Sequence, residues 1–211
     1  MAKKERKLTE AEARRLERFR EQMARLEADG WQRHDLTVSP AKANTLGSFY
    51  GLLLCVPLTL LFFVLGGGKL SPPGKDFILR WGILLAVILV LTVMHELIHG
   101  LTWARFSKEG WRSIEFGVIW KSLNPYCTCA EAMGRGQYLA ALLMPCFVLG
   151  VLPSLAACFT HNFWLLIAGL IMTASAGGDL LIASVILKNK MPAGTRYLDH
   201  PTEIGLVCFT R

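Results

Sequence analysis

The chain has 211 residues, 53% of them hydrophobic, and a formal net charge of +7 at pH 7. The apolar residues come in blocks, a composition that argues against an ordinary soluble globular domain. The basic excess does not indicate nucleic-acid binding, because no basic patch is interleaved with aromatic residues on a recognisable module. Basic residues that flank membrane spans explain the charge more simply, and the six cysteines show no disulfide framework.

Residues 1–30 are predicted to form an amphipathic helix. Thr9 and Glu12 fit a capping box, and Asp29-Gly30 fits a stop. Apolar residues recur at helical spacing, namely Leu8, Leu16, Phe19, Met23 and Leu26. Two interpretations stay open: a helix that lies on the inner leaflet or on a partner, and a solvated helix with a narrow apolar stripe. The polar start also predicts no cleavable signal peptide, so that the first apolar block is retained.

Four apolar blocks follow a polar connector at 31–44, and each is long enough to cross a hydrocarbon core of about 30 Å. They cover residues 49–66, 77–106, 138–160 and 163–187. We therefore predict an all-α integral membrane protein with about four transmembrane helices. Its expected parts are a cytoplasmic helix and connector (1–46), a membrane core (47–188) and a cytoplasmic tail (189–211).

Loop charges predict the orientation of these spans. Eleven Lys and Arg residues precede the first block, and the segments 107–137 and 188–211 each hold four. The turn at 161–162 has no full charge, and the loop at 67–76 has few. By the positive-inside rule, both termini and the segment 107–137 are expected on the cytoplasmic side of a bacterial membrane.

The segment 107–137 differs from the spans around it. Apolar residues alternate along 114–120, which predicts a short strand, and Asn124-Pro125 marks a turn. An open strand cannot face lipid, so this hairpin-like segment is expected in the cytoplasm or over the helices. It is either an edge that captures an extended substrate by strand addition or a purely structural hairpin.

His95-Glu96-Leu97-Ile98-His99 forms an HExxH motif inside the second apolar block. With the His and Glu content of this chain, roughly 0.006 chance matches are expected. Two histidines four residues apart project from one helix face and can bind zinc, and Glu96 can act as a general base on water. The alternative is that both histidines are polar groups satisfied by neighbouring helices.

A catalytic zinc usually needs a third protein ligand. Away from the ends of the blocks, His95, Glu96, His99 and Asp179 are the ionisable residues other than Cys and Tyr. Asp179 lies about as many residues into the fourth block as His95 lies into the second, which predicts that both sit about 25 Å from the outer surface. The small residues of Ser175–Gly178 favour close helix approach there. The alternative is that Asp179 caps a helix or pairs with a lysine.

Other candidate ligands are predicted to be surface groups or groups that support the ligands. They are Cys127, Cys129, Glu131, Asp199, His200 and Glu203. His161 is expected in the outer turn, too far from the motif, and His34 in the solvated connector.

These residues predict a zinc-dependent membrane metallopeptidase with one zinc ion, in which His95, His99 and Asp179 hold the metal and Glu96 is catalytic. Its expected partners are membrane lipid and a peptide or membrane-protein substrate. The alternative is a non-enzymatic scaffold or transporter accessory protein with a structural or vacant metal site. A metal transporter fits poorly, because the sequence has a single cluster of intramembrane ligands. Imidazole and carboxylate ligands also suit iron, cobalt or manganese.

The chain resembles a family of small bacterial membrane proteins known as zincin peptidases, which are distantly similar to site-2 proteases. The matching motifs run in order and are His95–Gly100, Pro125–Cys127, Leu142–Pro145, Gly178-Asp179 and Asp199–Pro201. The resemblance implies a metal held by His95, His99 and Asp179 and a catalytic Glu96. Site-2 proteases commonly carry an Asn-Pro-Asp-Gly-type motif around the third ligand, where this chain has Gly-Gly-Asp.

Overall fold

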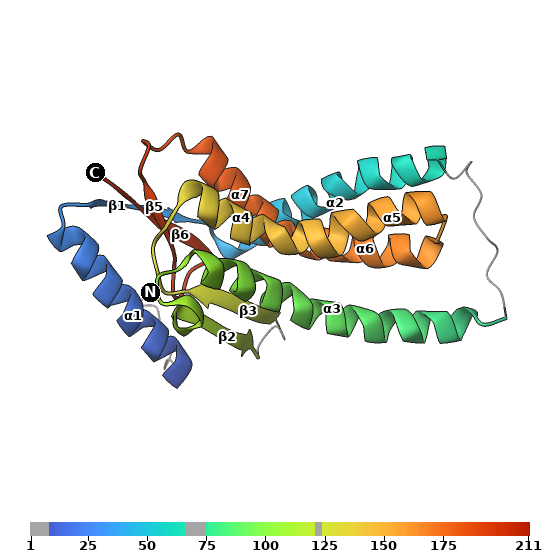
Figure 1. The fold of residues 1–211 in the computed structure, drawn as a ribbon, viewed down its shortest axis with the longest axis horizontal. Helices are drawn as coiled ribbons and strands as arrows, with labels where there is room; N and C mark the ends of the chain where they lie inside the picture. The colour runs from blue at the N-terminus through green and yellow to red at the C-terminus, as the bar shows by residue number, and fades with distance from the viewer. Residues whose placement is uncertain (1–8, 66–74, 121–123) are drawn as a thin grey trace.

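A computed structural model describes residues 9–65, 75–120 and 124–211 of the chain. It is mostly helical, with two small antiparallel sheets gathered at one end (Figure 1). The helices are α1 (Glu10–Ala28), α2 (Pro40–Leu65), α3 (Phe77–Phe106), η1 (Gly110–Ser113), α4 (Arg135–Pro145), the π-helical turn η2 (Cys146–Val151), α5 (Leu152–Thr160), α6 (Phe163–Ser175) and α7 (Gly177–Lys188). The strands are β1 (Gln32–Thr37), β2 (Ile114–Ile119), β3 (Asn124–Cys129), β4 (Met133–Gly134), β5 (Arg196–Asp199) and β6 (Gly205–Thr210).

Three helices are long and apolar enough to cross a membrane: α2, α3 and the run Arg135–Thr160 that joins α4, η2 and α5. The helices α6 and α7 are separated by a bend of 49°, and together they are long and apolar enough to form a fourth span. Three to four membrane-length helices thus occupy the four predicted apolar blocks.

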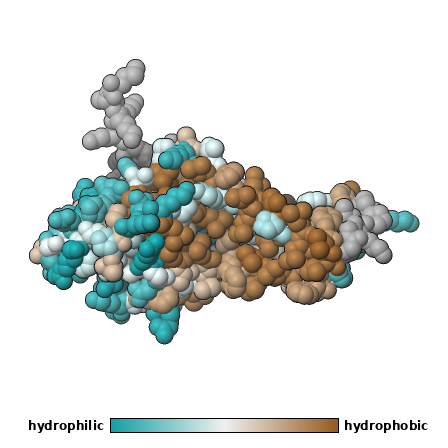
Figure 2. All heavy atoms as spheres, turned by 90° about the horizontal axis from the view of Figure 1, so that it is seen from above, coloured by the Kyte–Doolittle hydropathy of each residue, from teal (hydrophilic) through white to brown (hydrophobic). Residues whose placement is uncertain are grey.

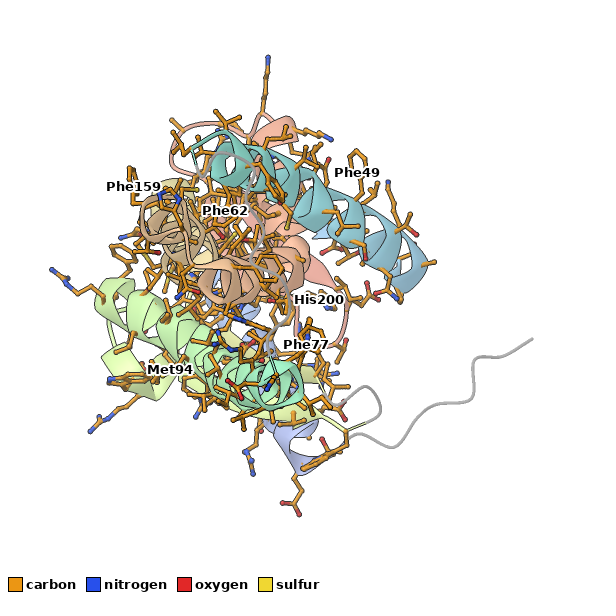
Figure 3. The ribbon with its side chains drawn as sticks, turned by 90° about the vertical axis from the view of Figure 1, so that its right-hand side faces the viewer. Phe49, Phe62, Phe77, Met94, Phe159 and His200 are labelled. Carbon is orange, nitrogen blue, oxygen red and sulfur yellow. The ribbon has the colours of Figure 1, made fainter. Side chains whose placement is uncertain are left out.

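The surface of these helices is apolar. Figure 2 shows hydrophobic side chains covering the helical part and hydrophilic ones gathering at the end that holds the sheets. Phe49 and Phe159 point outward and are 56% and 77% exposed, whereas Phe62 points into the bundle and is 3% exposed (Figure 3). Exposed aromatic and aliphatic side chains in such numbers are unusual for water-facing helices and typical of interaction with membrane or protein.

The predicted hairpin is present as a two-stranded sheet. β2 and β3 pair antiparallel from Ile114 opposite Cys129 to Ile119 opposite Asn124. The prediction of a turn at Asn124-Pro125 is wrong, because both residues belong to β3 and pair with Ile119 and Val118. The connection just before them lies outside the described residues. The strand predicted from alternation is therefore confirmed.

The all-α description was incomplete, because a four-stranded sheet in the order β1-β6-β5-β4 was not predicted. Its strands come from the supposed connector and tail. β1 is mostly exposed and lacks an alternating pattern, whereas residues 206–209 of β6 are all fully buried. A strand without alternation gives no period-2 signal, so only pairing between distant segments defines this sheet.

Helix α1 has the predicted start and stop: the Thr9–Glu12 capping box is formed, and Asp29 is the C-cap. Its apolar stripe packs on the chain's own sheet, where Phe19 is buried against Leu198, Val207 and Phe209. Neither interpretation of this helix anticipated an intramolecular partner. We call α1, β1, β4, β5 and β6 together the cap.

Candidate metal centre

Two helices supply the polar groups of the centre. His95 and His99 lie one turn apart on α3 and are 8% and 4% exposed. Asp179 lies in the first turn of α7, directly after the 49° bend that separates α7 from α6. The structure therefore brings Asp179 to the two histidines, although Asp179 follows His95 by 84 positions along the chain.

The side chains converge on one point. His95 Nε2 lies 3.2 Å from Asp179 Oδ2 and 3.2 Å from His99 Nε2, and His99 Nε2 lies 3.5 Å from Asp179 Oδ2. Ligand atoms about 2.0–2.1 Å from a tetrahedral zinc ion are about 3.3–3.4 Å apart. Within the described residues, this is the one group of His, Cys, Asp or Glu side chains found close enough to hold a metal ion.

The protonation of His99 also fits a cation. Its Nδ1 donates to the backbone carbonyl of Ala141 at 2.9 Å. A neutral imidazole that donates from Nδ1 presents a lone pair at Nε2. His99 Nε2 points to the Asp179 carboxylate and to the Nε2 of His95. A divalent ion at their centre could bind both Nε2 atoms and the carboxylate, so the three residues could hold a metal.

Glu96 stands beside the three converging atoms rather than among them. It is half-buried on α3, and the backbone N–H of Cys127 on β3 faces its carboxylate. The backbone N–H of Cys129 donates a hydrogen bond to Asp199 at 3.0 Å. The edge of β3 that faces away from β2 is therefore a wall of the site, and its Cys129 N–H is already hydrogen-bonded within the protein. Capture of an extended substrate by strand addition to this hairpin stays a prediction.

A cleft of about 660 Å³ reaches the three residues. Its walls come from α3, α4, α7, β3, the turn between β5 and β6, and α1. Arg15 of α1 lines this cleft with its guanidinium 4.3 Å from the ring centre of Tyr126 on β3. The cleft is therefore bounded by the apolar helices on one side and by the cap on the other.

Asp199 lines the same cleft but does not join the converging group. Its carboxylate accepts from the Tyr138 hydroxyl as well as from Cys129 N. Burial raises the pKa of the Asp199 carboxyl above its ordinary value. Asp199 therefore ties the cap to α4 and β3.

The remaining candidates have other roles. His200 Nδ1 accepts from the backbone N–H groups of Thr202 and Glu203, so it shapes the turn after β5. Glu131 accepts from the backbone N–H groups of Lys108 and Glu109. His161 ends α5 at the opposite end of the bundle (Figure 1), and His34 Nε2 lies 2.9 Å from the Thr210 hydroxyl.

Sequence reasoning missed two groups beside the three converging residues. The Ala141 carbonyl accepts from His99, and the Trp103 ring stacks on the His99 ring with centroids 5.3 Å apart. Every residue has a backbone carbonyl, so the sequence alone does not show which carbonyl accepts a hydrogen bond from His99. Trp103 follows His99 by one helical turn, a spacing that could have indicated the contact.

The chain matches the family model DUF3267, described as "Putative zincin peptidase", over residues 88–194. This match covers just over half of the chain. The chain belongs to this family. The three converging residues, Glu96 and the Ala141 carbonyl all lie within the matched region. No curated protein and no solved structure matches the chain.

Proposed function

We propose that this protein is an integral membrane zinc metallopeptidase that hydrolyses peptide bonds of membrane-bound or membrane-proximal substrates. The observation that carries the proposal is the convergence of His95, His99 and Asp179 next to Glu96 at a cleft. Membership of the zincin peptidase family and the membrane-length helices support it. Its location would be the bacterial cytoplasmic membrane, with both termini in the cytoplasm.

Each residue has a defined part in this chemistry. His95 and His99 would hold the ion through Nε2, and Asp179 through its carboxylate. A bound zinc ion supplies Lewis acidity, which makes water more acidic and polarises a carbonyl. The Glu96 carboxylate accepts the proton of the attacking water and returns it to the departing amine. The Cys127 N–H faces that carboxylate from the cleft wall.

The walls of the cleft support a substrate segment that lies near the membrane surface. Residues 124–128 of β3 and 199–205 of the β5–β6 turn line it together with the metal-binding helices. A peptide held there would lie between the apolar helices and the cap. An extended segment flanking a membrane anchor fits such a position.

Metal content is the first test. Detergent-purified wild type is expected to carry about one zinc ion per chain by mass spectrometry, and His95→Ala/His99→Ala is expected to carry none. His34→Ala/His161→Ala removes two histidines outside the centre and should keep the zinc. Wild type without zinc, even after zinc is supplied, would contradict the metal site.

Glu96→Gln then separates an enzyme from a scaffold. The amide cannot take a proton from water, so cleavage should fall by at least about 100-fold while zinc is kept. The readout is mass spectrometry of new peptide N-termini in membranes from cells that express each variant. Identical sets of N-termini in wild type and Glu96→Gln, with zinc bound in both, would favour the scaffold.

A further inference from the structure

We infer that Pro145 is a positioning residue of the metal centre, because its missing backbone N–H frees the Ala141 carbonyl to orient His99. The inference rests on the metal site of the proposed function and not on peptide hydrolysis. Pro145 itself touches neither a ligand atom nor the substrate cleft among the described contacts, so it acts through the backbone of α4.

The helical hydrogen-bond pattern isolates this carbonyl. In an α-helix, the carbonyl of Ala141 would accept from the N–H of residue 145. Proline has no N–H, and its ring crowds the carbonyl four residues before it. The next N–H, that of Cys146, bonds to Leu143 O instead. The helix then widens into the π-helical turn η2 directly after Pro145.

Ala141 is fully buried, so its carbonyl needs a donor from elsewhere in the protein. His99 Nδ1 is that donor, at 2.9 Å. The two needs are complementary: the proline leaves an acceptor without its helical partner, and the histidine requires an acceptor at Nδ1 to present Nε2 to Asp179.

This contact fixes both the tautomer and the direction of the ring. Histidines that bind metals commonly donate their other N–H to a carbonyl or carboxylate, and losing that partner typically costs 10–100-fold in metal affinity. Trp103 stacks on the same ring at an interplanar angle of 20° and limits its rotation. Pro145, Ala141 and Trp103 thus hold His99 from outside the metal-binding group.

Pro145→Ala tests the inference, because it restores an N–H that competes with His99 for Ala141 O. The zinc dissociation constant, measured by chelator competition on the detergent-purified full chain, should rise about 10- to 100-fold. Pro57→Ala is the matched control: Pro57 also lies inside a helix, α2, but outside the centre. It should leave zinc affinity unchanged.

A second readout needs no metal. In metal-free protein labelled with ¹⁵N-histidine, at a pH high enough to keep the imidazoles neutral, the wild-type His99 ring should be protonated at Nδ1, with its signals assigned by comparison with His99→Gln. Pro145→Ala should shift the population towards the Nε2-protonated tautomer, and Pro57→Ala should not. Should the alanine variant fail to fold, Pro145→Gly restores the same N–H.

The two readouts distinguish the two proposals. Absence of zinc from wild type would count against the proposed function, while the tautomer would still report on Pro145. An unchanged tautomer together with unchanged zinc affinity in folded Pro145→Ala would overturn the positioning role. An equal loss of affinity in Pro57→Ala would also overturn it, by showing a general effect of helix straightening.

Discussion

At the scale of single residues, the centre places a charged carboxylate and two buried imidazoles among apolar helices. A carboxylate among apolar helices is costly unless an opposite charge compensates it. Within the described part of the chain, the ion pairs found for Asp179 are with His95 and His99, and no lysine or arginine takes part. A divalent cation would compensate the carboxylate and satisfy both imidazoles at once, which gives the three residues a common reason to be there.

Asp179→Asn is expected to weaken zinc binding by about 100-fold or more. It removes the anionic ligand itself, and this loss should exceed the 10–100-fold that is typical when a group supporting a ligand is removed. Chelator competition measures the change. Glu203→Gln is the matched control, since it removes one negative charge from the same cleft without touching the converging group. Equal effects of the two variants would show that Asp179 acts only through net charge.

At the scale of secondary-structure elements, close packing of α2 against α7 places Asp179. A Cβ built on Gly177 would overlap the backbone oxygen of Gly47 on α2. One built on Gly51 of α2 would lie 2.6 Å from Ala174 O in the last turn of α6, just before the bend. The helices therefore approach to backbone contact at the bend where α7 begins. Gly178, the next residue, would meet nothing within 4 Å.

Gly177→Ala should push α2 and α7 apart and destabilise the protein by about 1–3 kcal/mol, the usual cost of overpacking. Because α7 carries Asp179, zinc affinity should fall as well. Thermal unfolding in detergent and chelator competition measure the two effects. Gly178→Ala adds the same methyl group in open space and should leave both unchanged; a loss of zinc in this control would point to the backbone conformation of the bend instead.

At the scale of the whole molecule, the centre lies where the apolar helices meet the cap. His95 is about 27 Å along α3 from its start at Phe77, by the rise of an α-helix. A hydrocarbon core is about 30 Å thick. In the proposed membrane orientation the centre would therefore lie near the cytoplasmic boundary, where water can reach it through the cleft.

Reporter fusions test this orientation. With both termini in the cytoplasm, green fluorescent protein fused after Arg211 should fluoresce, and alkaline phosphatase at the same position should be inactive, because its disulfides form only in an oxidising compartment. A phosphatase fused after His161 in the outer turn should be active. Phosphatase activity at Arg211 would reverse the predicted topology and place the cap outside the cell.

Much of the centre could be predicted from local sequence. The HExxH spacing puts His95 and His99 on one helix face, and counting residues from the outer ends put Asp179 at the same depth. The apolar blocks, the capping box of α1 and the alternation of β2 also report on structure within a few residues. Such signals can be recognised in the sequence because each depends on the spacing of side chains within a single helix or strand.

Contacts between distant segments carried no such signal. Residues 32–37 pair with 205–210, and Phe19 packs on the resulting sheet, because burial of β6 on both faces needs partners from elsewhere in the chain. The same holds for His99 and Ala141. The sequence shows His99 and, 46 positions later, Pro145, but it does not show that they are linked. Only the packing of α3 on α4 brings the Ala141 carbonyl to the His99 imidazole. Local periodicity therefore specified the candidate metal-binding side chains, whereas long-range packing specified what orients them and what encloses the cleft.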